Sequence, residues 1–370
     1  MDITAAVARG AQAPLALEAI TLEDPRAHEV VVRIVATGVC HTDLVTKSVF
    51  PAELPIVLGH EGAGIVERVG SEVTDVKVGD HVLLTYNSCG ECRPCTTGTP
   101  SYCENFVMLN TSGGRADFTS PLSQDGERVM GAFFGQSSFA SHVLVSRRSV
   151  VVVDDEVDLV ASAPFGCGVQ TGAGAVANVM RPQPHESIVI FGAGGVGMSA
   201  LMAARALGVE NVVAVDLSAE RLAVAKELGA STVIDGAAED VVAQVRAATD
   251  GGANFALDTT AANPVIANAL LALAPRGTLV LVGLGEASMD FEIGHLTGNG
   301  KAVRGCIEGT CDPQEFIPQL IEWHRSGKFP IERISRQYPF AEVNAAMHDA
   351  HTGATIKPIL VLPTEITPEP

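Results

Sequence analysis

The pattern of hydrophobic and polar positions divides the chain into two kinds of segment. From about residue 169 to about residue 307, short apolar runs alternate with segments of helical character. Strands are expected at residues 187–191, 212–215, 232–234, 255–257 and 279–282, and helices at 198–207 and 264–274. The apolar runs are typical of parallel strands that are buried on both faces. This alternation predicts a doubly wound parallel sheet of the nucleotide-binding type.

The remaining segments have another pattern. In residues 1–168, β-branched runs such as 30–35 and 81–84 are separated by glycine and aspartate turns, which predicts a mostly antiparallel β domain. After residue 307 we expect one amphipathic helix and a last strand, at 314–326 and 359–362, with the strand returning to the first domain. The predicted fold class is α/β plus β, with segments 1–168, 169–307 and 308–370. The active site is expected in the cleft between the two bodies.

Composition and charge narrow the class of protein. A chain of 370 residues with 47% hydrophobic residues and 37 glycines is typical of closely packed α/β enzymes. The net charge of −19 argues against a nucleic-acid partner, because phosphates would be repelled. The sequence shows neither an apolar run of membrane-spanning length nor the blocks of an export signal at its start. We therefore expect a cytoplasmic protein with a small-molecule substrate and no membrane partner.

Four cysteines lie close together in the segment C-G-E-C-R-P-C-T-T-G-T-P-S-Y-C, at Cys89, Cys92, Cys95 and Cys103. Thiolates are preferred zinc ligands, and four of them close a tetrahedron without leaving room for a substrate. The spacing therefore predicts a structural zinc site. The alternative is a set of disulfides in a secreted protein, but eight cysteines in 370 residues are too few for a disulfide scaffold.

A glycine-rich turn, G-A-G-G-V-G at 192–197, directly follows the strand expected at 187–191. This context is the dinucleotide-binding fingerprint, in which the helix N-terminus faces a pyrophosphate. Asp216 ends the next strand, 19 residues after the last glycine of the turn, where a carboxylate binds the ribose of NAD and repels the phosphate of NADP. Asp216 could instead cap the following helix, although Ser218 is better placed to do so. The residues expected to contact the pyrophosphate are Gly192, Gly194, Gly195, Val196 and Gly197.

A second set of potential metal ligands is spread along the chain. Cys40, His60 and Cys167 together would make a Cys₂His zinc site with its fourth position open for a substrate. Each residue taken singly has a simpler explanation, as a buried cysteine or a hydrogen-bonded histidine. Asp43 is the expected acceptor for the imidazole of His60. Glu61 is expected to be a transient ligand or an electrostatic partner of the metal.

Several motifs match those of a known family. They are G-V-C-H-T-D at 38–43, G-H-E-G-A-G at 59–64, the four-cysteine segment, G-C-G-V-Q-T-G-A-G at 166–174 and G-A-G-G-V-G at 192–197. Through them the chain resembles the zinc-dependent medium-chain alcohol dehydrogenases over nearly its whole length. It looks closest to the bacterial aryl-alcohol dehydrogenases, through F-F-G-Q-S-S-F-A at 133–140 and R-G-C-I-E-G at 304–309.

This resemblance implies a GroES-like catalytic domain, a Rossmann domain, NAD and two zinc ions per chain. The implied reaction oxidises benzyl-type primary alcohols to aldehydes, with hydride transfer to NAD. The implied catalytic residues are Cys40, Thr42, His60, Glu61 and Cys167, with Thr42 passing on the substrate proton. The implied cofactor contacts, besides the glycine turn and Asp216, are His41, Thr171, Arg221, Val282 and Lys357. The chain departs from the family at Val45, where the best-known members have a histidine that ends the proton relay.

Other functions stay open at this point. A general aliphatic alcohol dehydrogenase and a thiol-dependent formaldehyde dehydrogenase fit the same motifs. A protein that only senses NAD belongs to another class, and the open-sided Cys₂His set argues against it. A homodimer or homotetramer is expected, and a strand edge near residues 279–284 is the expected place for pairing between copies.

Overall fold

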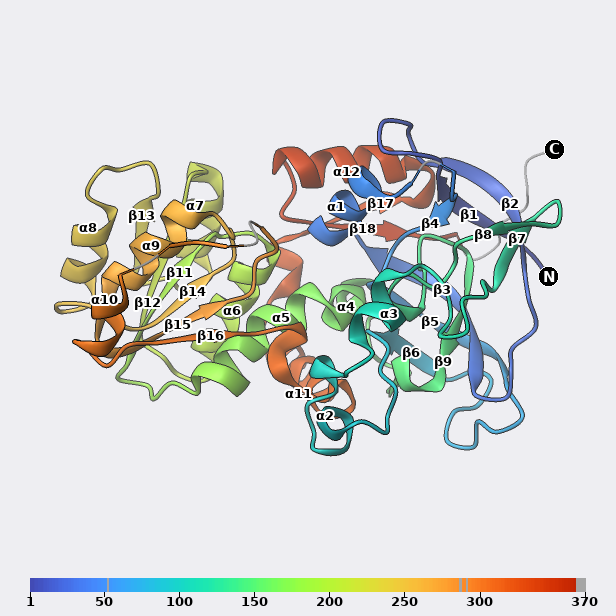
Figure 1. Ribbon diagram of the computed structural model, residues 1–370, viewed down its shortest axis with the longest axis horizontal. Helices are drawn as coiled ribbons and strands as arrows, with labels where there is room; N and C mark the ends of the chain where they lie inside the picture. The colour runs from blue at the N-terminus through green and yellow to red at the C-terminus, as the bar shows by residue number, and fades with distance from the viewer. Residues whose placement is uncertain (52, 286–287, 291, 364–370) are drawn as a thin grey trace. The chain divides into compact units, whose positions relative to one another are not determined.

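The computed structural model describes residues 1–51, 53–285, 288–290 and 292–363. The chain divides into two compact units (Figure 1). The first contains Met1–Cys167, Asp312–Ile321 and the described residues from Ser335 onward, and the second contains Gly168–Cys311 and Glu322–Ile334. Among the described residues, no helix combines the length and apolar character that crossing a membrane requires.

The first unit is built on two β-sheets. One has the strand order β4-β1-β2-β7-β8, and the other has the order β10-β6-β5-β3-β18-β17, with β9 also paired to β3. The pairings are antiparallel except that of β17 with β18. The expected antiparallel β domain is therefore confirmed. Its strands are β1 (Asp2–Ala8), β2 (Ala16–Leu22), β3 (Glu29–Gly38), β4 (Ile56–Val57), β5 (Gly62–Val69), β6 (His81–Leu84), β7 (Leu122–Gln124), β8 (Glu127–Val129), β9 (His142–Ser146), β10 (Val150–Val153), β17 (Ser335–Pro339) and β18 (Lys357–Val361).

Short helices join the strands of this unit. They are α1 (His41–Val49), α2 (Arg93–Thr96), α3 (Phe106–Thr111), α4 (Leu159–Ser162) and α12 (Val343–Thr352). The last strand, β18, pairs antiparallel with β3, with Ile359 opposite Gly38. Through this pairing the described residues from Ser335 onward belong to the first unit, and Lys357 lies close to the segment that carries Cys40, where it donates to the carbonyl of Val39.

The second unit contains a six-stranded parallel sheet with the order β13-β12-β11-β14-β15-β16. Its strands are β11 (Ser187–Phe191), β12 (Asn211–Asp216), β13 (Thr232–Asp235), β14 (Ala253–Asp258), β15 (Leu273–Leu281) and β16 (Ala302–Gly305). Its helices are α5 (Gly168–Gly174), α6 (Gly195–Ala206), α7 (Ala219–Glu227), α8 (Val241–Ala248), α9 (Asn263–Ala272) and α10 (Ile293–Thr297), and Figure 1 shows them around the sheet. The strand order reverses between β11 and β14, so the glycine turn after β11 lies at the switch point where such sheets bind ligands.

The parallel sheet and one helix of this unit differ from the sequence-based expectations. The prediction of an exposed strand edge near residues 279–284 was wrong, because β15 pairs with β14 on one side and with β16 on the other. Within the described chain, β16 ends the sheet, and its short sequence A-V-R-G has no long apolar run that could have predicted it. The helix expected at residues 264–274 ends at Ala272, because β15 begins at Leu273.

The units also differ from the expected segments after residue 307. Residues 308–311 belong to the second unit, because the turn around Gly309 packs on α5. Residues 322–334 belong to it as well, and there Arg333 forms an ion pair with Glu227. The helix expected at 314–326 is α11 (Pro313–Arg325), whose residues are shared between the two units.

Candidate metal centres and cofactor loop

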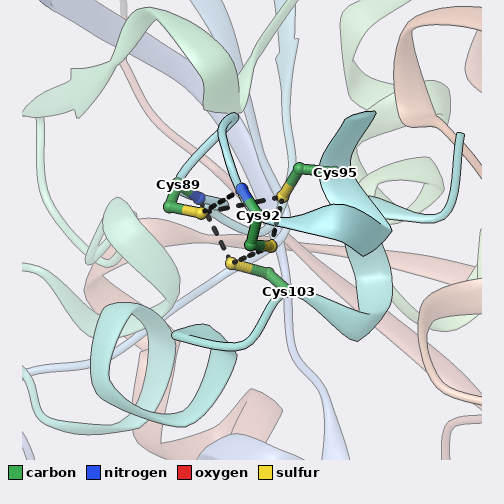
Figure 2. A group of neighbouring side chains, drawn as sticks. All are labelled: Cys89, Cys92, Cys95 and Cys103. Atoms are coloured by element: carbon green, nitrogen blue, oxygen red, sulfur yellow. Dashed lines mark hydrogen bonds between the residues drawn. The ribbon is translucent and has the colours of Figure 1, made fainter. Parts of the chain in front are cut away.

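The four cysteines of the 89–103 segment converge on one point (Figure 2). The Sγ atoms of Cys92 and Cys95 lie 3.4 Å apart, and Cys92 and Cys103 are 3.9 Å apart. All are free thiols, and these separations are far beyond the roughly 2 Å of a disulfide. The backbone N–H groups of Cys89 and Cys92 also point at sulfur atoms, those of Cys103 and Cys89 respectively. The disulfide alternative is therefore excluded for this segment.

The thiols of this cluster differ in how readily they ionise. Burial disfavours a thiolate at Cys89, but backbone N–H groups of Glu91 and Cys92 outweigh it and lower the pKa of Cys89 to about 6. Burial, with the neighbouring thiols, raises the pKa of Cys95 to about 12. Four thiolates at these distances need a cation between them, because like charges repel strongly at close range. The donor set and its geometry thus fit a structural Zn²⁺.

A second cluster brings together residues from distant parts of the sequence. Potential ligand atoms of Cys40, His60, Glu61 and Cys167 all lie within 4.8 Å of one another. Cys40 precedes α1, and His60 and Glu61 lie between β4 and β5. Cys167 is the last residue of the first of the segments that make up the first unit. The hydroxyl of Thr42 is 3.8 Å from the sulfur of Cys40. The structure therefore contains two candidate zinc sites, and the expected Cys₂His set is assembled at the second.

Asp43 holds this second cluster together. Its Oδ2 accepts a hydrogen bond from the backbone N–H of Cys40 at 2.9 Å. Its Oδ1 lies 2.9 Å from the backbone nitrogen of Gly59 and 3.0 Å from Nδ1 of His60. The side chain is fully buried. One carboxylate thus fixes both ligand segments and, by accepting from Nδ1, leaves Nε2 of His60 available for a metal.

The remaining ring nitrogen fits a metal ligand. Nε2 of His60 is buried and has no hydrogen-bond partner among the described residues. A buried polar atom without a partner is costly unless something coordinates it. A hydrogen bond with Cys167 lowers the pKa of the Cys40 thiol, and His60 lowers it further. Together they outweigh the effect of burial, so the pKa of Cys40 falls well below its usual range. This favours the thiolate that a metal requires. These observations fit zinc bound by Cys40, His60 and Cys167.

Glu61 has a second partner besides the cluster. Both of its carboxylate oxygens accept hydrogen bonds of 2.9 Å from Nζ of Lys357, which also donates to the carbonyl of Val39. Burial alone would lower the pKa of Lys357, but Glu61 and the neighbouring thiols outweigh it and raise the pKa. Lys357 is therefore a buried cation. A Cβ on Gly38 would overlap the carboxylate of Glu61, so this glycine makes room for the pair.

Two aromatic rings contact the imidazole of His60. The ring of Phe134 stacks on it with centroids 4.6 Å apart, and the ring of Phe133 meets it edge-on at 5.4 Å. Phe106 contacts Phe134 and Tyr86 in turn. Phe133 and Phe134 thus lie directly beside a ligand of the second metal cluster, with Phe106 and Tyr86 packed behind Phe134. We call these four residues the aromatic wall.

The glycine turn has the geometry that the fingerprint requires. Gly192 has a φ of +93°, which a side chain would strain, and a Cβ on Gly197 would overlap the carbonyl oxygen of Gly192. A Cβ on Gly194 would meet no atom within 4 Å, so the space beside it suits a pyrophosphate. Gly195 and Val196 form the first turn of α6, whose N-terminal end carries a partial positive charge. The residues present therefore fit a dinucleotide.

Asp216 ends β12 next to this turn. Its Oδ2 accepts from the backbone N–H of Ala193 at 2.6 Å, and its Oδ1 accepts from that of Ser218 at 2.9 Å. Ser218 caps α7, as expected, by accepting from the N–H of Arg221. Nη1 of Arg221 is 3.9 Å from Oδ2 of Asp216, and its buried Nε has no hydrogen-bond partner among the described residues. Asp216 and Arg221 thus lie side by side at the edge of the glycine turn.

The other expected cofactor residues are distributed over both units. Thr171 is buried in α5, and Val282 follows β15 and donates its backbone N–H to the carbonyl of Asp258. His41 is exposed at the start of α1, and Lys357 is bonded to Glu61. The expected contacts of His41 and Lys357 with the pyrophosphate stay predictions.

Sequence reasoning missed some residues that build the second cluster. Gln136 donates a hydrogen bond from Nε2 to the carbonyl of His60 and accepts one at Oε1 from the N–H of Gly62. It lies in the F-F-G-Q-S-S-F-A motif at 133–140, which by itself indicates a resemblance to a family and no contact with His60. An uncharged glutamine between aromatic and small residues was the available signal, since such a side chain needs partners when buried.

Comparisons with known proteins agree with this geometry. A model of the alcohol dehydrogenase GroES-like domain matches residues 26–155, and a model of the zinc-binding dehydrogenase family matches residues 195–326. The chain is 46% identical to a geraniol dehydrogenase of Castellaniella defragrans over 361 residues, which are 96% of this chain and 97% of that protein.

Two solved structures are similar over their full length. An alcohol dehydrogenase zinc-binding domain protein from Burkholderia ambifaria matches with a TM-score of 0.96 and 45% identity, covering 98% of this chain and 99% of that chain. The benzyl alcohol dehydrogenase of Acinetobacter calcoaceticus matches with a TM-score of 0.94 and 41% identity. The match covers 98% of this chain and 100% of that chain.

Proposed function

Because the chain belongs to the family of zinc-containing medium-chain alcohol dehydrogenases, we propose that it oxidises benzyl-type primary alcohols to aldehydes, with NAD as hydride acceptor. It is a zinc alcohol dehydrogenase, an oxidoreductase, by this membership. The finer choice of substrate rests on the aromatic wall at the second metal cluster, where Phe134 stacks on His60. Aromatic rings pack favourably on one another in offset or edge-on arrangements, so such surroundings favour an aromatic substrate over a flexible alkyl chain.

The residues of the second cluster have defined roles in this proposal. Cys40, His60 and Cys167 would hold the zinc, which supplies Lewis-acid chemistry that makes an alcohol easier to deprotonate. Asp43 keeps His60 in the tautomer that a metal needs. Thr42, whose hydroxyl lies close to the sulfur of Cys40, would accept the substrate proton. Glu61 would balance the charge of the site through its contact with Lys357.

The cofactor would bind at the glycine turn of the second unit. The N–H groups at the start of α6 would bind the pyrophosphate, and the carboxylate of Asp216 would accept hydrogen bonds from the ribose hydroxyls. Thr171, Val282 and Arg221 would complete the site beside the nicotinamide and the adenosine. His41 and Lys357 are the proposed contacts from the first unit, and Nζ of Lys357 would have to leave Glu61 to reach the pyrophosphate.

The substrate class is tested by following NADH formation with four compounds. We expect kcat/KM to be highest for benzyl alcohol and at least about tenfold lower for hexanol, a difference of about 1.4 kcal/mol. Geraniol is included because the similar dehydrogenase of Castellaniella defragrans bears its name, and a formaldehyde–thiol adduct tests the thiol-dependent alternative. Preference for hexanol or for the adduct would reject the benzyl-type proposal. NAD binding without turnover of any compound would favour a sensor.

A pair of variants tests the role of the aromatic wall. Phe134→Leu removes the ring that stacks on His60, and it should lower the ratio of kcat/KM between benzyl alcohol and hexanol. Phe316→Leu removes another buried phenylalanine, in α11, and should leave this ratio as in the wild type. Equal ratios in both variants would show that the wall does not select the substrate.

A further inference from the structure

The backbone around His60 is held by a segment that lies far along the chain. Residues 57–60 offer four successive carbonyl groups, and each accepts a hydrogen bond from residues 136–139. Oγ of Ser137 donates to the carbonyl of Val57 at 2.7 Å, and the N–H of Phe139 donates to that of Leu58 at 2.9 Å. The N–H of Ser138 donates to the carbonyl of Gly59 at 2.8 Å, and Nε2 of Gln136 donates to that of His60 at 2.9 Å. Buried carbonyl groups need such partners, so the second segment acts as a clamp on the first. We call residues 136–139 the clamp segment.

Gln136 makes the contact closest to the metal ligand. Its Nε2 donates to the carbonyl of His60, and its Oε1 accepts from the N–H of Gly62 at 3.1 Å. Because one partner is an acceptor and the other a donor, the orientation of the amide is fixed. The side chain has no exposed surface. A single amide therefore spans the backbone on both sides of the dipeptide His60-Glu61.

The glycines of the G-H-E-G motif permit this close approach. A Cβ on Gly59, which has a φ of +88°, would overlap Phe139. A Cβ on Gly62 would lie 2.9 Å from Cβ of Ser138 and 3.1 Å from Oε1 of Gln136. Both distances are too short for ordinary packing. The spacing of the two glycines around His60-Glu61 is thus explained by the clamp segment.

The turn that leads into the clamp segment has an unfavourable backbone. Phe134, Gly135 and Ser137 have φ values of 49°, 67° and 53°. For a residue other than glycine, such a conformation costs about 1–3 kcal/mol and persists only where surrounding contacts enforce it. Here the N–H of Phe133 donates to Oγ of Ser137 at 2.9 Å, and the ring of Phe134 stacks on His60. The strained turn therefore brings both the amide of Gln136 and an aromatic face to the same ligand.

We propose that Gln136 is a positioning residue that fixes the backbone from which His60 reaches the metal. Asp43 fixes the rotation of the imidazole through its hydrogen bond with Nδ1. Gln136 fixes the position of the His60 backbone, from which the side chain extends, through its hydrogen bond to the carbonyl. Both restraints are needed because a ring held only at Nδ1 still moves with its backbone. The inference rests on the proposed function in one respect, namely that Cys40, His60 and Cys167 hold the catalytic zinc.

Release of zinc to a chelator tests this role without an activity assay. Gln136→Met keeps the length of the side chain and removes the hydrogen bonds to His60 and Gly62, together with a longer one of 3.4 Å from Nε2 to the carbonyl of Thr85. In the fully loaded protein, we expect the zinc at Cys40, His60 and Cys167 to be released about 10- to 100-fold faster than in the wild type. Loss of a hydrogen-bond partner of a metal ligand typically weakens metal binding by this factor. The equivalent at Cys89, Cys92, Cys95 and Cys103 serves as an internal reference and should leave at the wild-type rate.

A matched variant separates this effect from general damage to the clamp segment. Ser138→Ala removes a buried side-chain hydrogen bond, 2.7 Å to Oγ1 of Thr37, from the same segment. It leaves the backbone bond to Gly59 and the amide of Gln136 in place. We expect wild-type release of both zinc equivalents. Equal rates for Gln136→Met and Ser138→Ala, or equal acceleration of both equivalents in Gln136→Met, would overturn the proposal.

Two further measurements keep the test decisive. With Co²⁺ in the second cluster, the visible absorption bands report ligand geometry, and they should shift in Gln136→Met but not in Ser138→Ala. If Gln136→Met does not fold, Gln136→Glu keeps the shape and the acceptor for Gly62, and its release is compared with that of Ser138→Ala in the same way. Absence of turnover with every alcohol would refute the proposed function, whereas unselective zinc release refutes the role of Gln136 alone.

Discussion

Lys357 and Glu61 lie 296 residues apart in the chain, yet they form a buried ion pair in which Nζ is 2.9 Å from both carboxylate oxygens. The pair adjoins the second metal cluster, since Glu61 is one of its four members. It joins β18, near the end of the chain, to the segment that carries His60. A charge at this depth is stable only while its partner is present.

Removing one member of this pair should cost more than removing both. Lys357→Met leaves the Glu61 carboxylate buried without its cation, and we expect a loss of about 3–5 kcal/mol in the free energy of unfolding. The double variant Lys357→Met/Glu61→Gln should be less destabilised than Lys357→Met. Urea denaturation of the zinc-loaded proteins measures both, with Lys77→Met, a change at an exposed lysine, as the near-neutral control. A double variant that is no more stable than the single one would contradict this prediction.

The two cysteine clusters should respond differently to the loss of one ligand. Cys92→Ser should release one zinc equivalent and lower the melting temperature, because this metal orders an irregular segment. Cys167→Ser should release the other equivalent and abolish turnover while the four-cysteine site keeps its zinc. Metal content by mass spectrometry and thermal unfolding distinguish the two outcomes. Loss of both equivalents from either variant would show that the sites are not independent.

Val45→His should change the pH dependence of turnover. Val45 lies three residues after Thr42 in α1, so the two side chains share one face of the helix. An imidazole there adds a proton acceptor with a pKa of about 6.5 to the proposed route. The measurement is kcat for benzyl alcohol as a function of pH, with Val45→Gln as a polar control that does not titrate. A profile identical to that of Val45→Gln would mean that the proton leaves by another path.

Asp216 should decide between NAD and NADP. Asp216→Asn removes the negative charge beside the ribose and leaves Arg221 next to it, so the ratio of kcat/KM for NADP to that for NAD should rise at least about tenfold. Asp250→Asn removes a charge from an exposed turn of the same unit and should not alter the ratio. A wild-type protein that already prefers NADP would reject the assignment.

Cys306 should be inert in the native protein. It is buried, and burial raises the pKa of its thiol to about 11 from a usual value of 9.0. Iodoacetamide at pH 8 should therefore leave Cys306 unmodified in the native protein and modify it in urea, as mass spectrometry of peptides would show. The unfolded chain releases this proton first, so the thiol's contribution to stability should fall as the pH rises above about 9. Modification of the native protein at pH 8 would contradict this account.

Short sequence motifs predicted the four-cysteine metal site and the dinucleotide-binding turn, because the residues of each motif lie close together in the chain. The spacing of Cys89, Cys92, Cys95 and Cys103 lets one loop surround a metal, and the structure assembles all four. The glycine turn lies between a strand and a helix, and Asp216 ends a strand, as expected, because these elements follow one another directly in the chain. The parallel sheet was predictable from apolar runs, but β16 was not, because it is short and contains only two apolar residues.

The sequence by itself thus determined the ligand types, the cofactor fingerprint and the two kinds of domain. The sequence also named Cys40, His60 and Cys167, but only the tertiary structure brings these distant residues to one point. The ion pair of Glu61 with Lys357 depends on the pairing of β18 with β3, and the clamp by Gln136 depends on a strained turn that approaches two glycines. Such contacts follow from packing between segments far apart in the chain, which no local pattern of residues encodes.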